Sequence, residues 1–180
     1  MEVILRWKTR TRKCFENVET ERLVLRRVTK NDLEDIFRIH SDPEANLYTS
    51  RGPLENIDAA RAKLDVWLKD WKRNGFGYWA VIFKDDNRMN GIGGVKKIYF
   101  GNREVLNLYY NLSPEKWGRG YATEMIAKAL EIAGSCLPSY PLVARVREKN
   151  ISSRRVAEKA GFKRNESLDA DEYLTYVLNW

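Results

Sequence analysis

The stretch Ser113-Pro-Glu-Lys-Trp-Gly-Arg-Gly-Tyr-Ala-Thr-Glu124 joins a predicted strand directly to a predicted helix. The first N–H groups of a helix have no intrahelical acceptor, and the helix dipole adds partial positive charge there, so a phosphate can bind at this end. Gly118 and Gly120 let the backbone approach an anion, or adopt a positive φ, without a Cβ clash, and Arg119 adds a cation. We therefore expect an anion-binding turn.

Other nucleotide-binding turns do not match this stretch. The dinucleotide fingerprint needs a third glycine at a fixed offset, and the phosphate-binding loop of nucleotide triphosphatases needs Gly-Lys-Ser/Thr; both are absent here. A Gly-x-Gly pair alone is also compatible with a tight loop that only begins a helix. The surrounding sequence therefore has to indicate what the turn binds.

Residues upstream of the turn predict three consecutive antiparallel strands. β-branched and aromatic residues are enriched at 78–83, 92–100 and 105–112, and short turns separate these segments. Pro114 ends the third segment, 105–112, because proline cannot donate a hydrogen bond to a sheet ladder. Strand alternation should point Tyr109 and Tyr110 to opposite faces of the sheet.

The remaining elements indicate the fold class. Helical spacing of apolar residues marks 33–39, 56–71, 122–133 and 151–160, and further strands are expected at 23–26, 141–146 and 173–178. This order predicts an α/β (α+β) fold, with about six to seven strands in a mixed, mainly antiparallel central sheet and about four flanking helices. One connection should be a parallel crossover.

A second motif follows one predicted strand after the turn. Trp-Gly-x-Gly-Tyr-Ala-Thr-Glu at 117–124, Asn-x-x-Ser at 150–153 and Glu-Lys-x-Gly-Phe at 158–162 together resemble the GNAT N-acetyltransferase superfamily. The opening Glu-Thr-Glu-Arg-Leu-Val-Leu-Arg at 19–26 resembles its ribosomal-protein N-terminal (alanine/serine) acetyltransferase branch. The resemblance covers residues 19–178 and implies a GNAT-like fold, with acetyl-coenzyme A (acetyl-CoA) as co-substrate.

The resemblance also implies a cofactor site. The third meander strand should splay from the next strand and free backbone groups, the turn should hold the pyrophosphate, and Asn150 should hold the pantetheine amides. Arg154, Arg155 and Lys159 could meet the 3′-phosphate. The residues expected to bind the cofactor are Asn111, Leu112, Trp117, Gly118, Arg119, Gly120, Tyr121, Ala122, Asn150, Ser153 and Arg154. The alternatives are ordinary ladder residues, helix capping and a solvated helix face.

Catalytic roles follow from the same resemblance. The Leu112 N–H is the candidate donor to the oxyanion, and Ser153 could donate to the departing sulfur. Glu172 lies at the offset from Ser153 where similar ribosomal-serine acetyltransferases carry a glutamate, so it is the candidate general base. Glu104 and Glu148 are rivals for that role, and direct attack helped by a chain of waters is a further possibility.

The implied reaction moves an acetyl group to a primary amine through a tetrahedral intermediate. An α-amine has a reference pKa near ~8 against ~10.4 for lysine, so it loses its proton more readily. We expect a protein or peptide α-amine, with a small amine (polyamine, amino sugar or antibiotic) as the alternative. A nucleic-acid-binding module, and a GNAT-like fold that binds acetyl-CoA without transfer, are the other readings.

Composition limits the partners and the compartment. The net charge of +7 favours anionic partners. No apolar run approaches the about 20 residues of a membrane helix, and the first residues do not resemble a signal peptide, so we expect a cytoplasmic protein without a membrane partner. No linker or repeat divides the 180 residues. We expect one domain at 19–180 after an N-terminal extension at 1–18, as a monomer or homodimer.

The chain has two cysteines and one histidine, which could in principle take part in chemistry. Cys14 and Cys136 have no paired spacing, so we expect reduced thiols, with neither a disulfide nor a metal site. His40 is interpreted as structural, and Trp67 and Trp71 as core residues on the apolar stripe of their helix.

Overall fold

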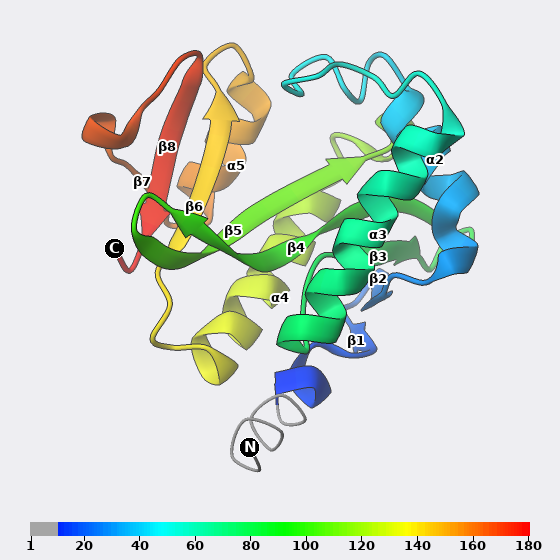
Figure 1. Cartoon of the computed structure of the whole chain (residues 1–180), viewed down its shortest axis with the longest axis horizontal. Coiled ribbons are helices and arrows are strands. Elements are labelled where there is room, and N and C mark those ends of the chain that lie inside the picture. Colours follow the sequence, from blue (N-terminus) through cyan, green and yellow to red (C-terminus); the bar gives the residue numbers. More distant parts are fainter. Residues whose placement is uncertain (1–10) are drawn as a thin grey trace.

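A computed structural model describes residues 11–180 and shows one eight-stranded sheet, with the strand order β1-β2-β3-β4-β5-β6-β8-β7. The strands and helices are β1 (Val18–Glu19), β2 (Leu23–Arg27), α2 (Leu33–Ser41), α3 (Ile57–Asn74), β3 (Trp79–Phe83), β4 (Arg88–Phe100), β5 (Arg103–Leu112), α4 (Tyr121–Cys136), β6 (Leu142–Arg147), α5 (Ile151–Lys159), β7 (Lys163–Arg164) and β8 (Tyr173–Leu178). Short 3₁₀ helices lie at η1 (Lys30–Asp32), η2 (Pro114–Lys116) and η3 (Glu166–Leu168). Helices α2 and α3 cover one face of the sheet, and α4 and α5 cover the other (Figure 1).

The predicted mixed, mainly antiparallel sheet is confirmed. Strands β3, β4 and β5 form the predicted meander, and the β5–β6 pair is the only parallel one among the described strands. The sheet has eight strands rather than six to seven because the two-residue strands β1 and β7 extend its two edges. Strands this short carry no readable alternation, so the sequence pattern could not mark them.

The predicted helix at 56–71 is α3, which runs from Ile57 to Asn74 and so extends three residues beyond the predicted end. The side chain of Asn56 accepts a hydrogen bond from the Ala59 N–H at 3.0 Å, which caps the first turn. Gly75 ends the helix with φ of 79°, a left-handed conformation that glycine adopts without strain. Trp67 and Trp71 are buried at 4% and 2% exposure, so the prediction that both belong to the core is confirmed.

Residues 11–18 pack onto the domain. Residues 11–15 are helical, and β1 pairs with β2 as an edge strand. Phe15 is fully buried, and its carbonyl accepts a hydrogen bond from the Trp79 indole at 2.7 Å. Residues 1–10 of the expected extension lie outside the described residues. No helix of the described part is both long and apolar enough to cross a membrane.

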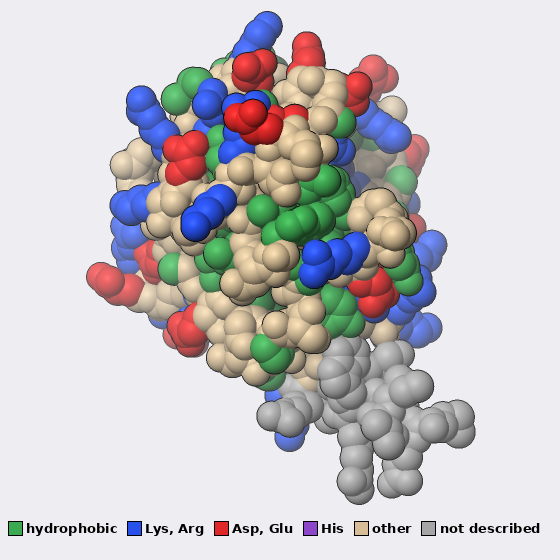
Figure 2. Space-filling model, turned by 90° about the vertical axis from the view of Figure 1, so that its left-hand side faces the viewer, with side chains coloured by type: hydrophobic (Ala, Val, Ile, Leu, Met, Phe, Trp, Pro, Cys, Tyr) green, Lys and Arg blue, Asp and Glu red, His purple; other side chains and the backbone are tan. Residues whose placement is uncertain are grey.

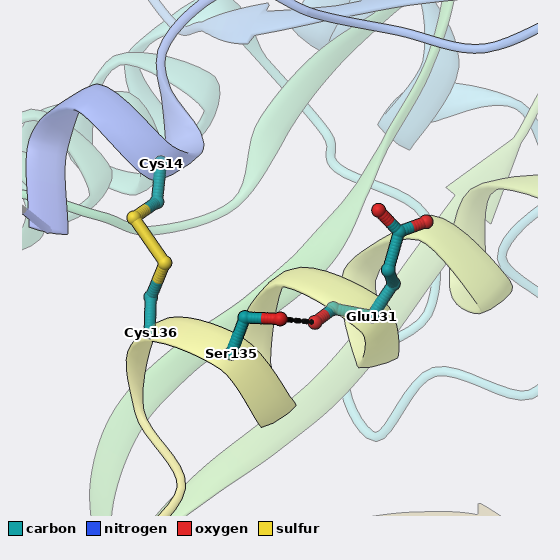
Figure 3. Close-up of a disulfide and its surroundings, with 4 residues drawn as sticks. All are labelled: Cys14, Glu131, Ser135 and Cys136. Carbon is teal, nitrogen blue, oxygen red and sulfur yellow. Dashed lines mark hydrogen bonds between the residues drawn. A yellow bond between two sulfur atoms is a disulfide. The ribbon is translucent and has the colours of Figure 1, made fainter.

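The expectation of two reduced thiols is wrong, because Cys14 and Cys136 form a disulfide. The bond joins the helical segment 11–15 to the last residue of α4 (Figure 3). The two cysteines are 122 residues apart in the sequence, so no local spacing could reveal the pairing. Disulfides persist mainly in oxidising compartments, and the cytoplasmic location stays a prediction.

The two parallel strands, β5 and β6, diverge after a short paired stretch. Strand β5 pairs with β6 only at Leu106–Leu142 and Asn107–Val143, although both strands continue beyond these pairs. The arrows of β5 and β6 separate toward the edge where the loop between α2 and α3 lies (Figure 1). The predicted splay is therefore confirmed, and it opens the sheet where the site is expected.

Candidate active site

A cleft of about 500 Å³ occupies the opening between β5 and β6. Residues 108–112 of β5 and 144–147 of β6 form its walls, and the start of α4, the first turns of α5 and the loop after α2 complete it. The cleft therefore joins the face under α4 and α5 to the face under α2 and α3. Of the predicted site residues, it brings together Asn111, Leu112, Trp117, Gly118, Gly120, Tyr121, Ala122, Asn150 and Ser153.

The start of α4 has the geometry of an anion-binding turn. Gly118 and Gly120 have φ of 71° and 80°, so both adopt the left-handed conformation that favours glycine. The first backbone hydrogen bond of the helix runs from the Glu124 N–H to the Gly120 carbonyl at 3.0 Å. Within residues 11–180, the N–H groups of residues 118–123 bind no acceptor. These donors lie at the positive end of the helix dipole and at the wall of the cleft.

Arg22 holds this turn in place. Its Nε donates to the Glu124 carboxylate at 2.6 Å, its Nη1 donates to the Arg119 carbonyl at 2.8 Å, and its guanidinium lies 4.5 Å from the Tyr121 ring centre. Thr20 Oγ1 donates to the same carboxylate at 2.5 Å. Burial would raise the pKa of Glu124, but these hydrogen bonds lower it, so the carboxylate stays ionised. Arg22 lies in the opening stretch 19–26 and Glu124 in the stretch 113–124, but the sequence alone indicated no role for either residue.

Lys116 anchors the other end of the turn. Its side chain is 6% exposed, and its Nζ lies 2.9 Å from Asp85 and 2.7 Å from Asp86 in the turn between β3 and β4. Burial alone would lower the pKa of Lys116, but the hydrogen bonds with Asp86 and Asp85 raise it. The turn is thus fixed to the rest of the domain at both ends.

The Leu112 N–H faces the opening between the strands. Leu106 N–H donates to the Pro141 carbonyl on the β6 side, and Ser113 N–H donates to the Asn90 carbonyl beside β4. Because backbone N–H groups alternate sides along a strand, the N–H of Leu112 points to the same side as that of Leu106. Its carbonyl already accepts a hydrogen bond from the Trp117 indole at 2.8 Å. Among residues 11–180 the Leu112 N–H is therefore left available for a ligand.

Ser153 lies in the cleft and contacts Tyr110. The Tyr110 hydroxyl donates to Ser153 Oγ at 2.9 Å, so the serine proton is free to point into the cleft. Asn150 caps α5 by accepting from the Ser153 N–H at 3.0 Å, which is the capping role that was the alternative to cofactor binding. Burial raises the pKa of Tyr110, so its hydroxyl keeps its proton. Strand alternation placed Tyr109 and Tyr110 on opposite faces but could not show which of the two meets α5.

Asn111 shapes the far side of the cleft. Alternation turns its N–H toward β4, and its side chain donates to the Asn46 side chain at 2.8 Å. Asn46 in turn donates to the carbonyls of Ile39 and Asp42 at 2.8 and 2.9 Å. These bonds fix the loop that carries Tyr48 over the cleft.

Tyr109 points to the opposite face from Tyr110, as predicted, and contacts His40. His40 Nδ1 lies 3.0 Å from the Ile36 carbonyl and Nε2 lies 3.1 Å from the Tyr109 hydroxyl, so Nδ1 carries the proton and Nε2 accepts from Tyr109. Burial, followed by the charge of Lys63, lowers the pKa of His40 to about 4. Burial raises the pKa of Tyr109 to about 12. His40 is a buried neutral residue that positions a cleft tyrosine.

The depressed pKa of His40 predicts a loss of stability in acid. Between its ordinary pKa of 6.5 and about 4, the unfolded chain binds a proton that the folded chain does not. Stability should therefore fall as the pH drops through this window, by about 3 kcal/mol in total from this residue. Urea unfolding of wild type and His40→Gln from pH 7 to pH 4 measures the difference. Equal pH dependence of the two proteins would contradict the assignment.

Three predicted site residues do not line the cleft. Glu172 has a side chain that is 70% exposed and pairs with Arg147. The Arg154 guanidinium lies 3.3 Å from both the Tyr176 hydroxyl and the Glu148 carbonyl, and the Arg119 side chain is exposed. The rival carboxylates also lie outside the cleft, since Glu104 pairs with Lys97 at 2.9 Å and Glu148 is exposed at the end of β6. The structure therefore brings no predicted carboxylate base into the cleft.

The described residues hold no cluster of metal-ligating side chains. On the face of the molecule shown in Figure 2, Lys and Arg side chains are mixed with Asp and Glu. A nucleic-acid-binding face would instead gather its basic side chains in one patch or stripe.

The chain is similar to known acetyltransferases over most of its length. The acetyltransferase (GNAT) domain model matches residues 22–163. The uncharacterized N-acetyltransferase YoaA of Bacillus subtilis is 28% identical over 154 residues, which are 86% of each chain. An acetyltransferase from Agrobacterium tumefaciens superposes with a TM-score of 0.78 at 24% identity, covering 91% of this chain and 94% of the other.

A ribosomal L7/L12 α-N-protein acetyltransferase, solved in complex with coenzyme A, has the same fold. Its TM-score is 0.72 at 16% identity, with 90% of this chain and 96% of that chain covered. The family match spans the anion-binding turn, the diverging strands and the serine of α5. This chain belongs to the acetyltransferase (GNAT) family.

Proposed function

We propose that this chain transfers an acetyl group from acetyl-CoA to the α-amine of a protein or peptide, as the ribosomal-protein branch of the family does. The observation that carries the proposal is the cleft through the sheet, which links the anion-binding turn on one face to the loop after α2 on the other. The pyrophosphate would bind the free N–H groups of residues 118–123. The thioester would then lie in the opening between β5 and β6.

In this arrangement the Leu112 N–H donates to the oxyanion of the tetrahedral intermediate. Ser153 donates to the departing sulfur, and Tyr110, which donates to Ser153, holds the serine in that orientation. Because Glu172 is exposed and paired with Arg147, we propose attack by the neutral amine, with its proton passed to water. An α-amine with a pKa near ~8 is in part neutral at pH 7, so it needs no strong base.

Calorimetric titration with acetyl-CoA, followed by an assay of coenzyme A release with N-terminal peptides and small amines, tests this function. Saturable binding and acetylation of the peptide α-amine are expected. Absence of acetyl-CoA binding by the folded protein would overturn the proposal. Transfer to a small amine alone would keep the acetyltransferase activity and replace the acceptor by the alternative.

Replacing Ser153 by alanine is expected to lower kcat by at least about tenfold, because a hydrogen bond to a charged group contributes about 1.5–3 kcal/mol. The KM for acetyl-CoA should change little, since the thiolate forms only during the reaction. Steady-state kinetics measure both constants. Ser135→Ala is the matched control, because that hydroxyl lies near the far end of α4 and donates to the Glu131 carbonyl. An unchanged kcat in Ser153→Ala would remove the serine from the mechanism.

A further inference from the structure

An aromatic cluster lies behind the cleft on the face under α2 and α3. The rings of Tyr109 and Tyr78 are 5.1 Å apart, and those of Tyr78 and Trp67 are 6.2 Å apart. The His40 ring lies 5.6 Å from Trp67, and its Nε2 meets the Tyr109 hydroxyl. Tyr109 is the member of this cluster that lines the cleft, and Tyr78, Trp67 and His40 are buried behind it.

Two lysine side chains extend over this cluster. Lys96 of β4 places its Nζ 5.4 Å from the Tyr78 ring centre, and Lys63 of α3 places its Nζ 5.7 Å from the Trp67 ring centre. Lys96 pairs with Asp70 at 3.2 Å. Lys63 is partly buried and forms no ion pair within residues 11–180. Two ammonium groups and one carboxylate thus lie around the aromatic cluster, behind the cleft residue Tyr109.

The neighbours of Lys63 add to the positive charge. Arg51 lies two residues after Thr49, which lines the cleft, and the charge of Arg51 acts on Lys63. Burial, then the charges of Lys96 and Arg51, lower the pKa of Lys63. Glu44 is the acidic residue of the cleft lining, and it is exposed to solvent. A cation held in a partly desolvated position beside other cations is stabilised when an anion binds next to it.

We propose that the acceptor carries a carboxylate or phosphate near its reacting amine, and that Lys63, Lys96 and Arg51 bind this anion on the α2–α3 side of the cleft. The inference rests on the proposed acetyltransferase function and names its substrate class. These cations would repel an acceptor that carries only an amine, whereas an anion on the acceptor would bind them and hold the amine near Tyr109, which lines the cleft. Polyamines are excluded as good acceptors for the same electrostatic reason.

Matched acceptors test the substrate class. One pair is two peptides that differ only in the residues after the N-terminal one, Asp-Asp against Lys-Lys; the other is a small amine with a carboxylate or phosphate against its uncharged amide or alcohol. We expect kcat/KM to be about tenfold or more higher for the anionic member, because a charged group that binds an anion contributes about that factor. The two pairs show whether the anion belongs to a peptide or to a small molecule.

Lys63→Gln and Lys96→Gln should each reduce this preference by about tenfold, by raising the KM for the anionic acceptor. Activity with the uncharged acceptor and the affinity for acetyl-CoA should stay as in wild type. Lys72→Gln is the matched control, because nine residues of helix place Lys72 about 180° around α3 from Lys63 and it is exposed. Thermal unfolding checks that each variant folds.

The outcomes separate this inference from the function on which it rests. A wild type that binds acetyl-CoA but uses cationic or neutral acceptors as well as anionic ones would overturn the inference alone. If Lys63→Gln lowered kcat/KM equally for anionic and uncharged acceptors, that result would also overturn the inference alone. A wild type that binds no acetyl-CoA would overturn the proposed function together with the inference.

Discussion

Acetyl-CoA binding should weaken at least about hundredfold when Gly120 is replaced by glutamate. The substitution puts a carboxylate at the turn where the N–H groups of residues 118–123 are free, with its Cβ 3.6 Å from Arg22 Nη2, so its negative charge repels the pyrophosphate. Loss of two hydrogen bonds to a charged group costs about 3–6 kcal/mol, and about 1.4 kcal/mol corresponds to a factor of ten in Kd. Isothermal titration calorimetry measures the change directly.

A glycine elsewhere provides the control for backbone strain. Gly120 has φ of 80°, so any side chain there also destabilises the fold by about 1–2 kcal/mol. Gly101 has φ of 61° in the exposed turn between β4 and β5, with no atom within 4 Å of an added Cβ. Gly101→Glu should therefore lose similar stability and keep wild-type affinity. Equal affinity of Gly120→Glu and Gly101→Glu would show that the turn does not bind the cofactor.

Local signals predicted most of the fold. The helix at 56–71 could be predicted because its apolar stripe lies within one segment, and the structure extends it to Asn74. The cofactor turn could be predicted for the same reason, since two glycines next to a helix start are a local pattern. The divergence of β5 and β6 came only from the family resemblance, because no residue in either strand marks where pairing stops.

Contacts between distant segments could not be predicted. Arg22 and Glu124 are 102 residues apart, and Tyr110 and Ser153 are 43 apart, so only the folded sheet brings each pair together. The place of Glu172 in the fold could not be predicted from its offset to Ser153 either. Strand β7 and the 3₁₀ helix after it occupy the chain between α5 and β8, and they leave Glu172 exposed beside Arg147 rather than in the cleft.

Loss of the Cys14–Cys136 disulfide should lower the free energy of unfolding by about 3–5 kcal/mol. The bond closes a loop of 122 residues, which includes most of the sheet, so it removes many conformations from the unfolded chain. For a domain of this size, the melting temperature should fall by about 10 °C. Thermal and urea unfolding of wild type, with and without reductant, and of Cys14→Ser/Cys136→Ser measure the effect. Reductant should not change the double variant.

The same variant shows whether the disulfide also acts on the site. Cys136 ends α4, and the helix begins at Tyr121 beside the cleft, about 22 Å away at ~1.5 Å per residue. Phe15 stays buried by packing on Phe76 and Trp79, with ring centres 5.1 and 5.7 Å away, so the segment next to Cys14 has its own anchor. Acetyl-CoA affinity should therefore stay within about threefold of wild type, which is below 1 kcal/mol. Two free thiols in the unreduced, unfolded wild type would contradict the disulfide itself. A large loss of acetyl-CoA affinity in the double variant would mean that the disulfide also orders α4.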